Sequence, residues 1–137
     1  MAATLKLEIV TPDAKTYSED VEMVTLPGAE GEMGIYPGHV PLMTQISAGE
    51  VIARKEGREQ SLAVGEGFVQ ITGDRVAILT DMAIRAENID EAQAEAARRR
   101  AEARLNEKLS DEEAAVASAA LAQSLAQLKV KRRRSQG

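Results

Sequence analysis

The sequence predicts an all-β sandwich at the N-terminus followed by a C-terminal antiparallel α-helical hairpin. Nine of the ten glycines and all four prolines of the 137 residues lie before residue 86. Thirteen alanines follow between Ala92 and Ala126, with no glycine or proline among them. Glycine and proline punctuate short strands, whereas Ala, Glu, Arg and Leu are strong helix formers. We therefore expect a β-sandwich domain over residues 1–86 and a two-helix hairpin with a basic tail over residues 87–137.

The first strand is predicted from alternation near the N-terminus. Leu5, Leu7 and Ile9 alternate with Lys6 and Glu8, which is the period-2 pattern of a strand with one buried face. Further strands are predicted at Val21–Met23, Val51–Ala53, Leu62–Val64, Phe68–Ile71 and Val76–Ile78. Turn signals separate them at Pro12-Asp13, Pro27-Gly28, Glu56-Gly57 and Gly73-Asp74. Short strands at intervals of about 8–12 residues favour a sandwich or barrel over an α/β fold.

Two helices are predicted in the second half. Asn88 and Asp90 are candidate N-caps of the first helix, because short polar side chains accept hydrogen bonds from unpaired helical N–H groups. Ser110 with Glu113 three residues later has the spacing of a capping box and starts a second helix. Apolar stripes at steps of three and four residues run through Ala94, Ala97, Ala101, Leu105 and Leu109, and through Ala114, Ala117, Leu121, Leu125 and Leu128. The short connection makes the helices antiparallel neighbours.

The small side chains of these stripes predict a weak contact between the helices. An alanine buries much less area than a leucine or isoleucine, whose full burial stabilises by about 1.5–3 kcal/mol. Two interpretations stay open at this point. The hairpin is either an element that opens at modest cost or a permanently docked one.

Composition excludes several classes of function. The chain has no cysteine and a single histidine, His39, so we expect no disulfide, no cysteine or histidine metal site and no catalytic pair of imidazoles. Aromatic residues make up 2 %, and the formal net charge is −5, which disfavours binding to nucleic acid. We expect no membrane insertion, since no apolar run approaches about 18 residues, and no catalytic residues or cofactors.

The most unusual stretch runs from Leu26 to Leu42. It holds four glycines, three prolines, two carboxylates and the single histidine of the chain. Glycine permits positive φ, and proline fixes φ and removes a hydrogen-bond donor. The pattern predicts a stiff, polar display loop on a β-scaffold, which is a common way to build a binding surface.

This stretch and four others resemble the ε subunit of bacterial F-type ATP synthases, called δ in mitochondria. The matching segments are Ile9-Val10-Thr11-Pro12, the EGE-x-GI-x-PGH-x-PL pattern of residues 30–42, Gly65-Glu66-Gly67-Phe68, residues 78–83 (ILTDMA) and Ile89-Asp90. The resemblance covers nearly the whole chain. It implies a ten-stranded β-sandwich followed by two helices, in agreement with the fold predicted from the residues.

The resemblance also implies a non-catalytic role in a rotary complex. Family ε subunits sit at the foot of the central stalk, bound to the γ subunit and the membrane c-ring, and they rotate with both during proton-driven ATP synthesis. Their helices can regulate ATP hydrolysis. For this chain we expect a peripheral location at the cytoplasmic face of the bacterial inner membrane, reached through partner subunits.

Three residues of the display loop are expected at the interface with γ and the c-ring. Glu32 matches the family carboxylate that faces the polar loops of the c-ring, and Glu30 is a candidate helper. An exposed ion pair contributes only about 0–1 kcal/mol, so such a carboxylate would orient the subunit rather than supply affinity. His39 matches the family histidine of the PGH turn, for which we favour a structural or interface role over a titrating one.

A nucleotide site on the hairpin is the weaker implication of the resemblance. Some relatives bind ATP through an Ile/Leu-Asp-x-x-Arg-Ala motif and further arginines on both helices. Ile89, Asp90 and Arg100 match, but Gln93 replaces the motif arginine. Gln123 and Gln127 stand where two further arginines are needed. We predict weak or absent ATP binding, because charge-assisted contacts to phosphate are the strong ones.

A basic segment, Lys129–Arg134, lies near the end of the sequence. One interpretation is a solvated helix end whose charges offset the negative pole of the helix dipole. The resemblance offers another, in which an extended hairpin brings Lys131, Arg132, Arg133 and Arg134 to acidic segments of the α/β catalytic head.

Two other classes of function stay open. A small nucleic-acid or protein-binding module would use the basic hairpin, although residues 1–85 carry seven basic against thirteen acidic residues. A carboxylate-based hydrolase would use Glu30 and Glu32, but no third group is placed to tune them.

Overall fold

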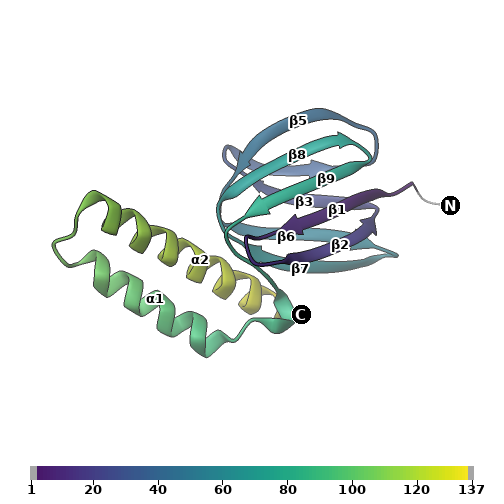
Figure 1. Ribbon diagram of the computed structural model, residues 1–137. Coiled ribbons are helices and arrows are strands. Elements are labelled where there is room, and N and C mark those ends of the chain that lie inside the picture. The colour runs from purple at the N-terminus through teal and green to yellow at the C-terminus, as the bar shows by residue number, and fades with distance from the viewer. Residues whose placement is uncertain (1–2, 136–137) are drawn as a thin grey trace.

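The computed structural model describes residues 3–135, apart from the side chains of residues 15, 16 and 135. It confirms the predicted fold class, with a ten-stranded N-terminal β-sandwich followed by two helices (Figure 1). The strands are β1 (Leu5–Val10), β2 (Lys15–Val21), β3 (Met23–Gly28), β4 (Gly31–Ile35), β5 (His39–Ile46), β6 (Gly49–Lys55), β7 (Arg58–Val64), β8 (Gly67–Gly73), β9 (Arg75–Thr80) and β10 (Ala83–Arg85). A 3₁₀ turn, η1 (Ala86–Asn88), leads into α1 (Glu91–Leu105) and α2 (Asp111–Ser135).

The strands form two layers. One layer holds β10, β7, β6, β3 and β4, and the other holds β5, β8, β9, β1 and β2 (Figure 1). The layers are joined where Gly28 of β3 pairs with Ile46 of β5. All strand pairs are antiparallel except β1 with β9, which run parallel. Leu5, Leu7 and Ile9 are buried between the layers, as their alternation predicts.

One aromatic side chain lies in the core between the layers. Tyr17 is 2 % exposed, and its hydroxyl donates a hydrogen bond to Gln60 Oε1 at 2.5 Å. The Arg85 guanidinium lies 5.1 Å from its ring centroid. Burial raises the pKa of the Tyr17 hydroxyl above its ordinary value, because the charged phenolate would lose its hydration.

The short-strand predictions are confirmed for β6, β7, β8 and β9, but the segment Val21–Met23 is not one strand. β2 ends at Val21 and β3 begins at Met23, so the segment is the junction between two strands. The backbone N–H of Glu22, between them, donates to Arg54 O at 2.8 Å. β2, β4 and β5 lack strong apolar alternation, which explains why the pattern does not indicate them.

The glycine- and proline-rich stretch is strand rather than loop over most of its length. Pro27 and Gly28 belong to β3, and β4 and β5 follow, so only two tight turns remain, at Ala29-Glu30 and Pro37-Gly38. Gly31 and Gly38 have φ of +136° and +81°, the backbone region that favours glycine. The expected display loop is therefore the β3–β4 hairpin together with the turn that opens β5.

Both predicted helix starts are confirmed. The Asp90 side chain accepts a hydrogen bond from Gln93 N at 3.1 Å and caps α1. Ser110 and Glu113 form the reciprocal capping box, with Glu113 N donating to Ser110 Oγ and Ser110 N donating to a Glu113 carboxylate oxygen, each at 3.2 Å. The hydrogen bond from the Ser110 backbone N–H lowers the pKa of the Glu113 carboxyl, because it favours the charged carboxylate. α1 ends at Leu105, so Leu109 lies in the connection and not on the predicted helical stripe.

The C-terminal half of α2 is held between α1 and the sandwich. Ala117 and Leu128, two residues of the predicted stripe, are buried, and α2 packs along α1. Ala126 and Val130 join Ala63 and Ile89 in a small apolar cluster that docks the hairpin on the sandwich. Leu125, also predicted on the stripe, is 48 % exposed instead.

Candidate functional site

The β3–β4 hairpin brings the two predicted loop carboxylates together and leaves the histidine apart. Glu30 lies in the turn, and Glu32 lies two residues into β4 opposite Pro27, with both side chains exposed. His39 begins β5 at the opposite end of β4 and pairs with Gly73. A strand rises about 3.3 Å per residue, so a strand length separates His39 from the carboxylates. The three residues do not form one compact site.

His39 makes a local contact. Its Nδ1 lies 2.6 Å from the carbonyl oxygen of Val40, and the side chain is half-buried at the start of β5. With the proton on Nδ1 the ring donates this hydrogen bond and is held against its own strand. Glu30 and Glu32 have neither an ion pair nor a side-chain hydrogen bond among residues 3–135, so their charges are available to an external partner.

An exposed apolar surface, not predicted from the sequence, lies on the layer that contains β5, β8 and β9. Met43, Phe68 and Leu79 are 66 %, 52 % and 54 % exposed. Phe68 pairs directly with Leu79 across β8 and β9, and Leu79 pairs with Val10 of β1. We call this set, Val10, Met43, Phe68 and Leu79, the Phe68 face.

The sequence contains a signal for this face. Phe68 and Gln70 alternate with the buried Val69 and Ile71, so alternation assigns the Phe68 side chain to the outer surface. A large aromatic side chain on a solvent-facing row is typical of a contact surface. Alternation cannot show which residue of the neighbouring strand lies beside Phe68. The register of β8 with β9 places Leu79 there.

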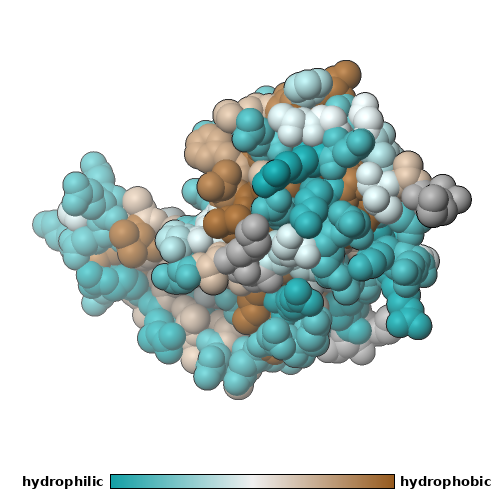
Figure 2. Space-filling model, turned by 45° about the vertical axis from the view of Figure 1, so that its right-hand side comes forward, coloured by the Kyte–Doolittle hydropathy of each residue, from teal (hydrophilic) through white to brown (hydrophobic). Residues whose placement is uncertain are grey.

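Two surface hollows border the Phe68 face. One of about 490 Å³ is lined by Ala29, Gln45 and Phe68 together with the β7–β8 turn, and one of about 390 Å³ is lined by Val10, Pro12 and Leu79. Figure 2 shows apolar side chains gathered on the sandwich beside the hollow that separates it from the hairpin. The combination of apolar side chains with adjacent concave surface suits a protein partner better than a small molecule.

The residues matched to a nucleotide motif lie where the hairpin meets the sandwich. Ile89 is 3 % exposed and belongs to the apolar cluster, so its side chain is core. Asp90 is occupied as the cap of α1. A hollow of about 510 Å³ next to it is lined by Ile84, Asn88, Asp90, Gln93, Ala94, Ala96, Ala97, Arg100, Ser124 and Gln127.

Among the described residues that line this hollow, a single side chain is cationic, that of Arg100. Its other polar groups are amides, a hydroxyl and the Asp90 carboxylate. The negative charge of this carboxylate would repel a phosphate. Gln123 does not line it, and its amide nitrogen lies instead near Gly65 and Asp81. The residues present fit a triphosphate poorly.

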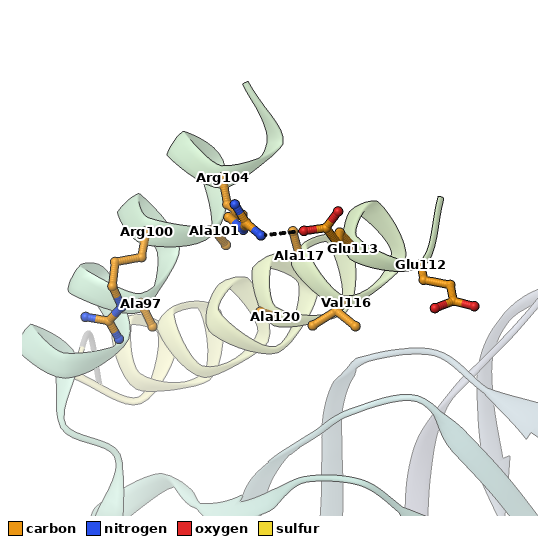
Figure 3. A pocket seen from close by; sticks show the side chains of 9 residues that line it. All are labelled: Ala97, Arg100, Ala101, Arg104, Glu112, Glu113, Val116, Ala117 and Ala120. Carbon is orange, nitrogen blue, oxygen red and sulfur yellow. Dashed lines mark hydrogen bonds and ion pairs between the residues drawn. The ribbon is translucent and has the colours of Figure 1, made fainter. Parts of the chain in front are cut away.

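A second groove, of about 530 Å³, lies between the helices near their connection (Figure 3). Ala97, Ala101, Ala117 and Ala120 line it together with the 71 % exposed Val116. Arg104 of α1 reaches across to Glu113 of α2 at 2.8 Å, the contact drawn as a dashed line in Figure 3. The groove results from alanines that leave the space between the two helices incompletely filled.

The arginines of the basic tail are bound within the molecule. Arg132 Nε donates to Glu91 at 2.9 Å, and Arg132 also contacts Glu95 at 3.2 Å, both on α1. Arg133 contacts Glu50 of β6 through both carboxylate oxygens, and Arg134 Nε donates to Ser61 Oγ of β7 at 2.8 Å. The tail is thus more than a solvated helix end. Lys131 is half-buried beside them.

Over residues 3–135, no three His, Cys, Asp or Glu side chains gather as a candidate metal site. In the same part of the chain, neither α1 nor α2 is long and apolar enough to cross a membrane.

Comparison with known proteins identifies the family. Residues 4–86 match the family described as "ATP synthase, Delta/Epsilon chain, beta-sandwich domain", and residues 87–132 match "ATP synthase, Delta/Epsilon chain, long alpha-helix domain". The chain therefore belongs to the delta/epsilon family of ATP synthase subunits.

Curated relatives agree over most of the chain. An ATP synthase epsilon chain from Dehalococcoides mccartyi is 46 % identical over 133 residues, covering 96 % of this chain and 95 % of the relative. Epsilon chains from Pelotomaculum thermopropionicum and Bacillus subtilis are 48 % and 44 % identical, over 77 % and 79 % of this chain and 78 % and 82 % of their own lengths.

Solved structures share the fold at lower identity. A chain of the Euglena gracilis mitochondrial ATP synthase, in a structure of OSCP, F1 and c-ring, superposes with a TM-score of 0.76 at 22 % identity. The match covers 98 % of this chain and 82 % of that one. A chain in the central stalk and c-ring structure of the Tetrahymena thermophila enzyme gives a TM-score of 0.66 at 11 % identity, over 94 % and 97 % of the two chains.

Proposed function

We propose that this chain is a non-catalytic subunit of the central stalk of an F-type ATP synthase, which connects the γ subunit to the c-ring and turns with both during proton-driven ATP synthesis. The observation that carries the proposal is the Phe68 face, an apolar surface built on a rigid sandwich next to a hairpin with two exposed carboxylates. Transmission of torque needs stiff, complementary surfaces and no proton-transfer group.

The two surfaces suit different partners. Covering one large apolar side chain of the Phe68 face removes it from water and stabilises a complex by about 1.5–3 kcal/mol, so this face is assigned to γ. Glu30 and Glu32 present charge from a stiff turn, and we assign them to basic groups on the polar loops of the c-ring. His39, a strand length away, is assigned to the γ side with Met43 of the same strand.

The location follows from these contacts. The chain would lie at the cytoplasmic face of a bacterial inner membrane, held there by γ and the c-ring rather than by insertion of its own helices into lipid.

Binding to γ is tested by co-purification of tagged γ with chain variants. Phe68→Glu places a charge in the centre of the Phe68 face and is expected to reduce the recovered complex by tenfold or more, since burying an unpaired charge costs several kcal/mol. Lys108→Glu, in the exposed connection between the helices, is the control and should bind as the wild type does. Equal recovery of both variants would remove the Phe68 face from the proposal.

The c-ring contact is tested by crosslinking from position 32. The chain has no cysteine, so Glu32→Cys provides a unique attachment site for a photocrosslinker. Crosslinks to the c-ring are expected in the assembled enzyme, and Asp13→Cys, in the β1–β2 turn, serves as a comparison. Labelling of the c-ring from position 13 but not from position 32 would refute the assignment of the hairpin.

We also propose that the helices regulate ATP hydrolysis, with Lys131 to Arg134 contacting acidic segments of the catalytic head when the hairpin opens. Support comes from the alanine-rich seam between the helices and from the basic tail. Removing residues 111–137 is expected to raise the ATPase activity of the reconstituted catalytic sector while co-purification with γ persists. Unchanged hydrolysis with γ still bound would exclude the inhibitory role.

A further inference from the structure

Three consecutive arginines near the end of α2 reach two different partners. Successive residues of an α-helix point about 100° apart, so Arg132 faces α1 while Arg133 and Arg134 face the sandwich. Of the three arginines, only Arg133 and Arg134 connect the hairpin to the sandwich. The contacts of Arg132 hold the helices to each other and would persist if the hairpin moved as a unit.

The contact of Arg133 has the geometry of a strong ion pair. Its Nε lies 2.9 and 3.1 Å from the two carboxylate oxygens of Glu50, and its Nη2 lies 2.5 Å from one of them. Such bidentate, charge-assisted contacts are the stronger class of hydrogen bond. The Glu50 side chain is only 10 % exposed, so water screens the pair less than it screens a fully exposed one.

Ser61 completes the contact from the neighbouring strand. Its hydroxyl is buried, with the residue 4 % exposed, and accepts hydrogen bonds from Arg133 Nη2 at 3.2 Å and from Arg134 Nε at 2.8 Å. Arg134 also lies 3.8 Å from Glu59. Two strands and two arginines thus meet at one point, which we call the Glu50 node.

The apolar part of the docking surface is small. The cluster beneath α2 consists of Ala63, Ala86, Ile89, Ala126 and Val130, with Ala48, Met82 and Ile84 partly buried against it. Alanine contributes little burial energy, so this cluster holds the hairpin less strongly than a leucine-rich one would. The Glu50 node is the polar anchor of the docked position.

We propose that Arg133, bound to Glu50 and Ser61, is a latch that keeps the hairpin docked and its basic tail occupied. The inference rests on the proposed regulatory role of the hairpin and specifies the contact that controls its opening. While the latch is closed, Arg133 and Arg134 are paired with Glu50, Ser61 and Glu59 and are not available to an acidic partner. Docking on the sandwich and binding to acidic segments are therefore mutually exclusive uses of the same side chains.

The test measures opening in the full-length chain alone. Thr72→Cys on β8 and Lys108→Cys between the helices give two exposed labelling sites in a chain without native cysteine. Single-molecule energy transfer between dyes at these sites reports the fractions of docked and open hairpin. Removing one hydrogen-bonded charge with Glu50→Gln or Arg133→Gln is expected to increase the open-to-docked ratio about tenfold. Ser61→Ala should increase it by a smaller factor.

A matched control removes an ion pair that does not bridge the domains. Glu107→Gln eliminates the contact of Glu107 with Arg104 at 2.7 Å, near the tip of the hairpin, and should leave the ratio unchanged. The charge exchange Glu50→Arg with Arg133→Glu should restore most of the docked fraction. Added salt should open the wild type more than Arg133→Gln, because the pair is electrostatic.

An open-to-docked ratio that is unchanged in Glu50→Gln and Arg133→Gln would overturn the latch, as would equal opening in Glu107→Gln. These outcomes are separate from the test of inhibition. If the variants open as expected but deletion of residues 111–137 leaves hydrolysis unchanged, the latch stands and the inhibitory role fails. If deletion activates hydrolysis but the variants stay docked, the inhibitory role stands and the latch fails.

Discussion

At the scale of single residues, glycine marks the places where two backbone segments approach too closely for any side chain. A Cβ added to Gly67 would lie 1.9 Å from the backbone carbonyl oxygen of Leu79. Gly67 opposes Thr80 in the β8–β9 ladder and sits directly before Phe68. The contact surface proposed for γ therefore depends on a close backbone approach.

Gly67→Ala is expected to destabilise the sandwich by about 1–3 kcal/mol, the usual cost of forcing extra volume into a packed site. The obstacle is backbone, so it cannot be relieved by rotation of a side chain. Gly34→Ala is the matched control, since its new Cβ would meet only the terminal methyl of Met23 at 3.2 Å. Urea unfolding of the two variants measures the difference, and equal midpoints would contradict this reading of Gly67.

At the scale of the elements, polar caps define the helices more sharply than their apolar stripes do. α1 and α2 bury mostly alanine, so their ends are fixed by Asp90 and by the reciprocal pair Ser110 and Glu113. Glu113 also forms an ion pair with Arg104 at 2.8 Å. This contact joins the start of α2 to the end of α1. The capping box therefore sets both the start of the second helix and the turn between the helices.

Ser110→Ala is expected to cost about 0.5–2 kcal/mol of helix stability, because the first turn of α2 loses an acceptor for its unpaired N–H groups. Amide hydrogen exchange at residues 112–114 should accelerate while exchange in β1 and β9 stays as in the wild type. Ser110→Thr keeps the acceptor oxygen and serves as the control. Equal exchange in both variants would indicate that tertiary contacts, rather than the cap, hold this turn.

At the scale of the whole molecule, the docked hairpin brings three separate segments of the chain around one hollow. Arg100 lines it from α1 and Gln127 from α2, and Ile84 lines it from β10 of the sandwich. The hollow therefore depends on the docked conformation. Any ligand that filled it would favour docking, since a ligand stabilises the state that it binds.

We predict that millimolar ATP does not raise the melting temperature of the wild-type chain. The double substitution Gln93→Arg with Gln127→Arg would supply two cations at the hollow, and each charge-assisted contact to phosphate is worth about tenfold or more in affinity. The double variant should therefore show a melting shift with ATP that the Gln93→Asn, Gln127→Asn variant lacks. A clear shift in the wild type would show that Arg100 alone is sufficient.

The fold was largely predictable because the two halves obey different local rules. Alternation identifies β1, and caps identify the starts of both helices, since each of these signals acts within a few residues. β4 and β5 were not predictable in this way. Their glycines and prolines favour turns, and Ile71 of β8, which pairs with Leu42 of β5, lies far along the chain.

The candidate sites were predictable to a smaller degree. Glu30 and Glu32 were identified from a local motif, and the structure does place them together. The separation of His39 from them, the neighbourhood of Phe68 and Leu79, and the Glu50 contact of Arg133 all depend on register or docking. Arg133 and Glu50 are 83 positions apart, a distance at which no local pattern carries information.

The order of residues alone decided the division into a strand-rich and a helical part, the positions of the caps and the absence of cysteine chemistry, because these depend on composition and on neighbours within one turn. The tertiary structure decided which apolar side chains stay exposed as the Phe68 face and where the tail arginines bind. Those outcomes depend on strand register and on the docking of α2, which are set by the burial of many side chains together and not by any single segment.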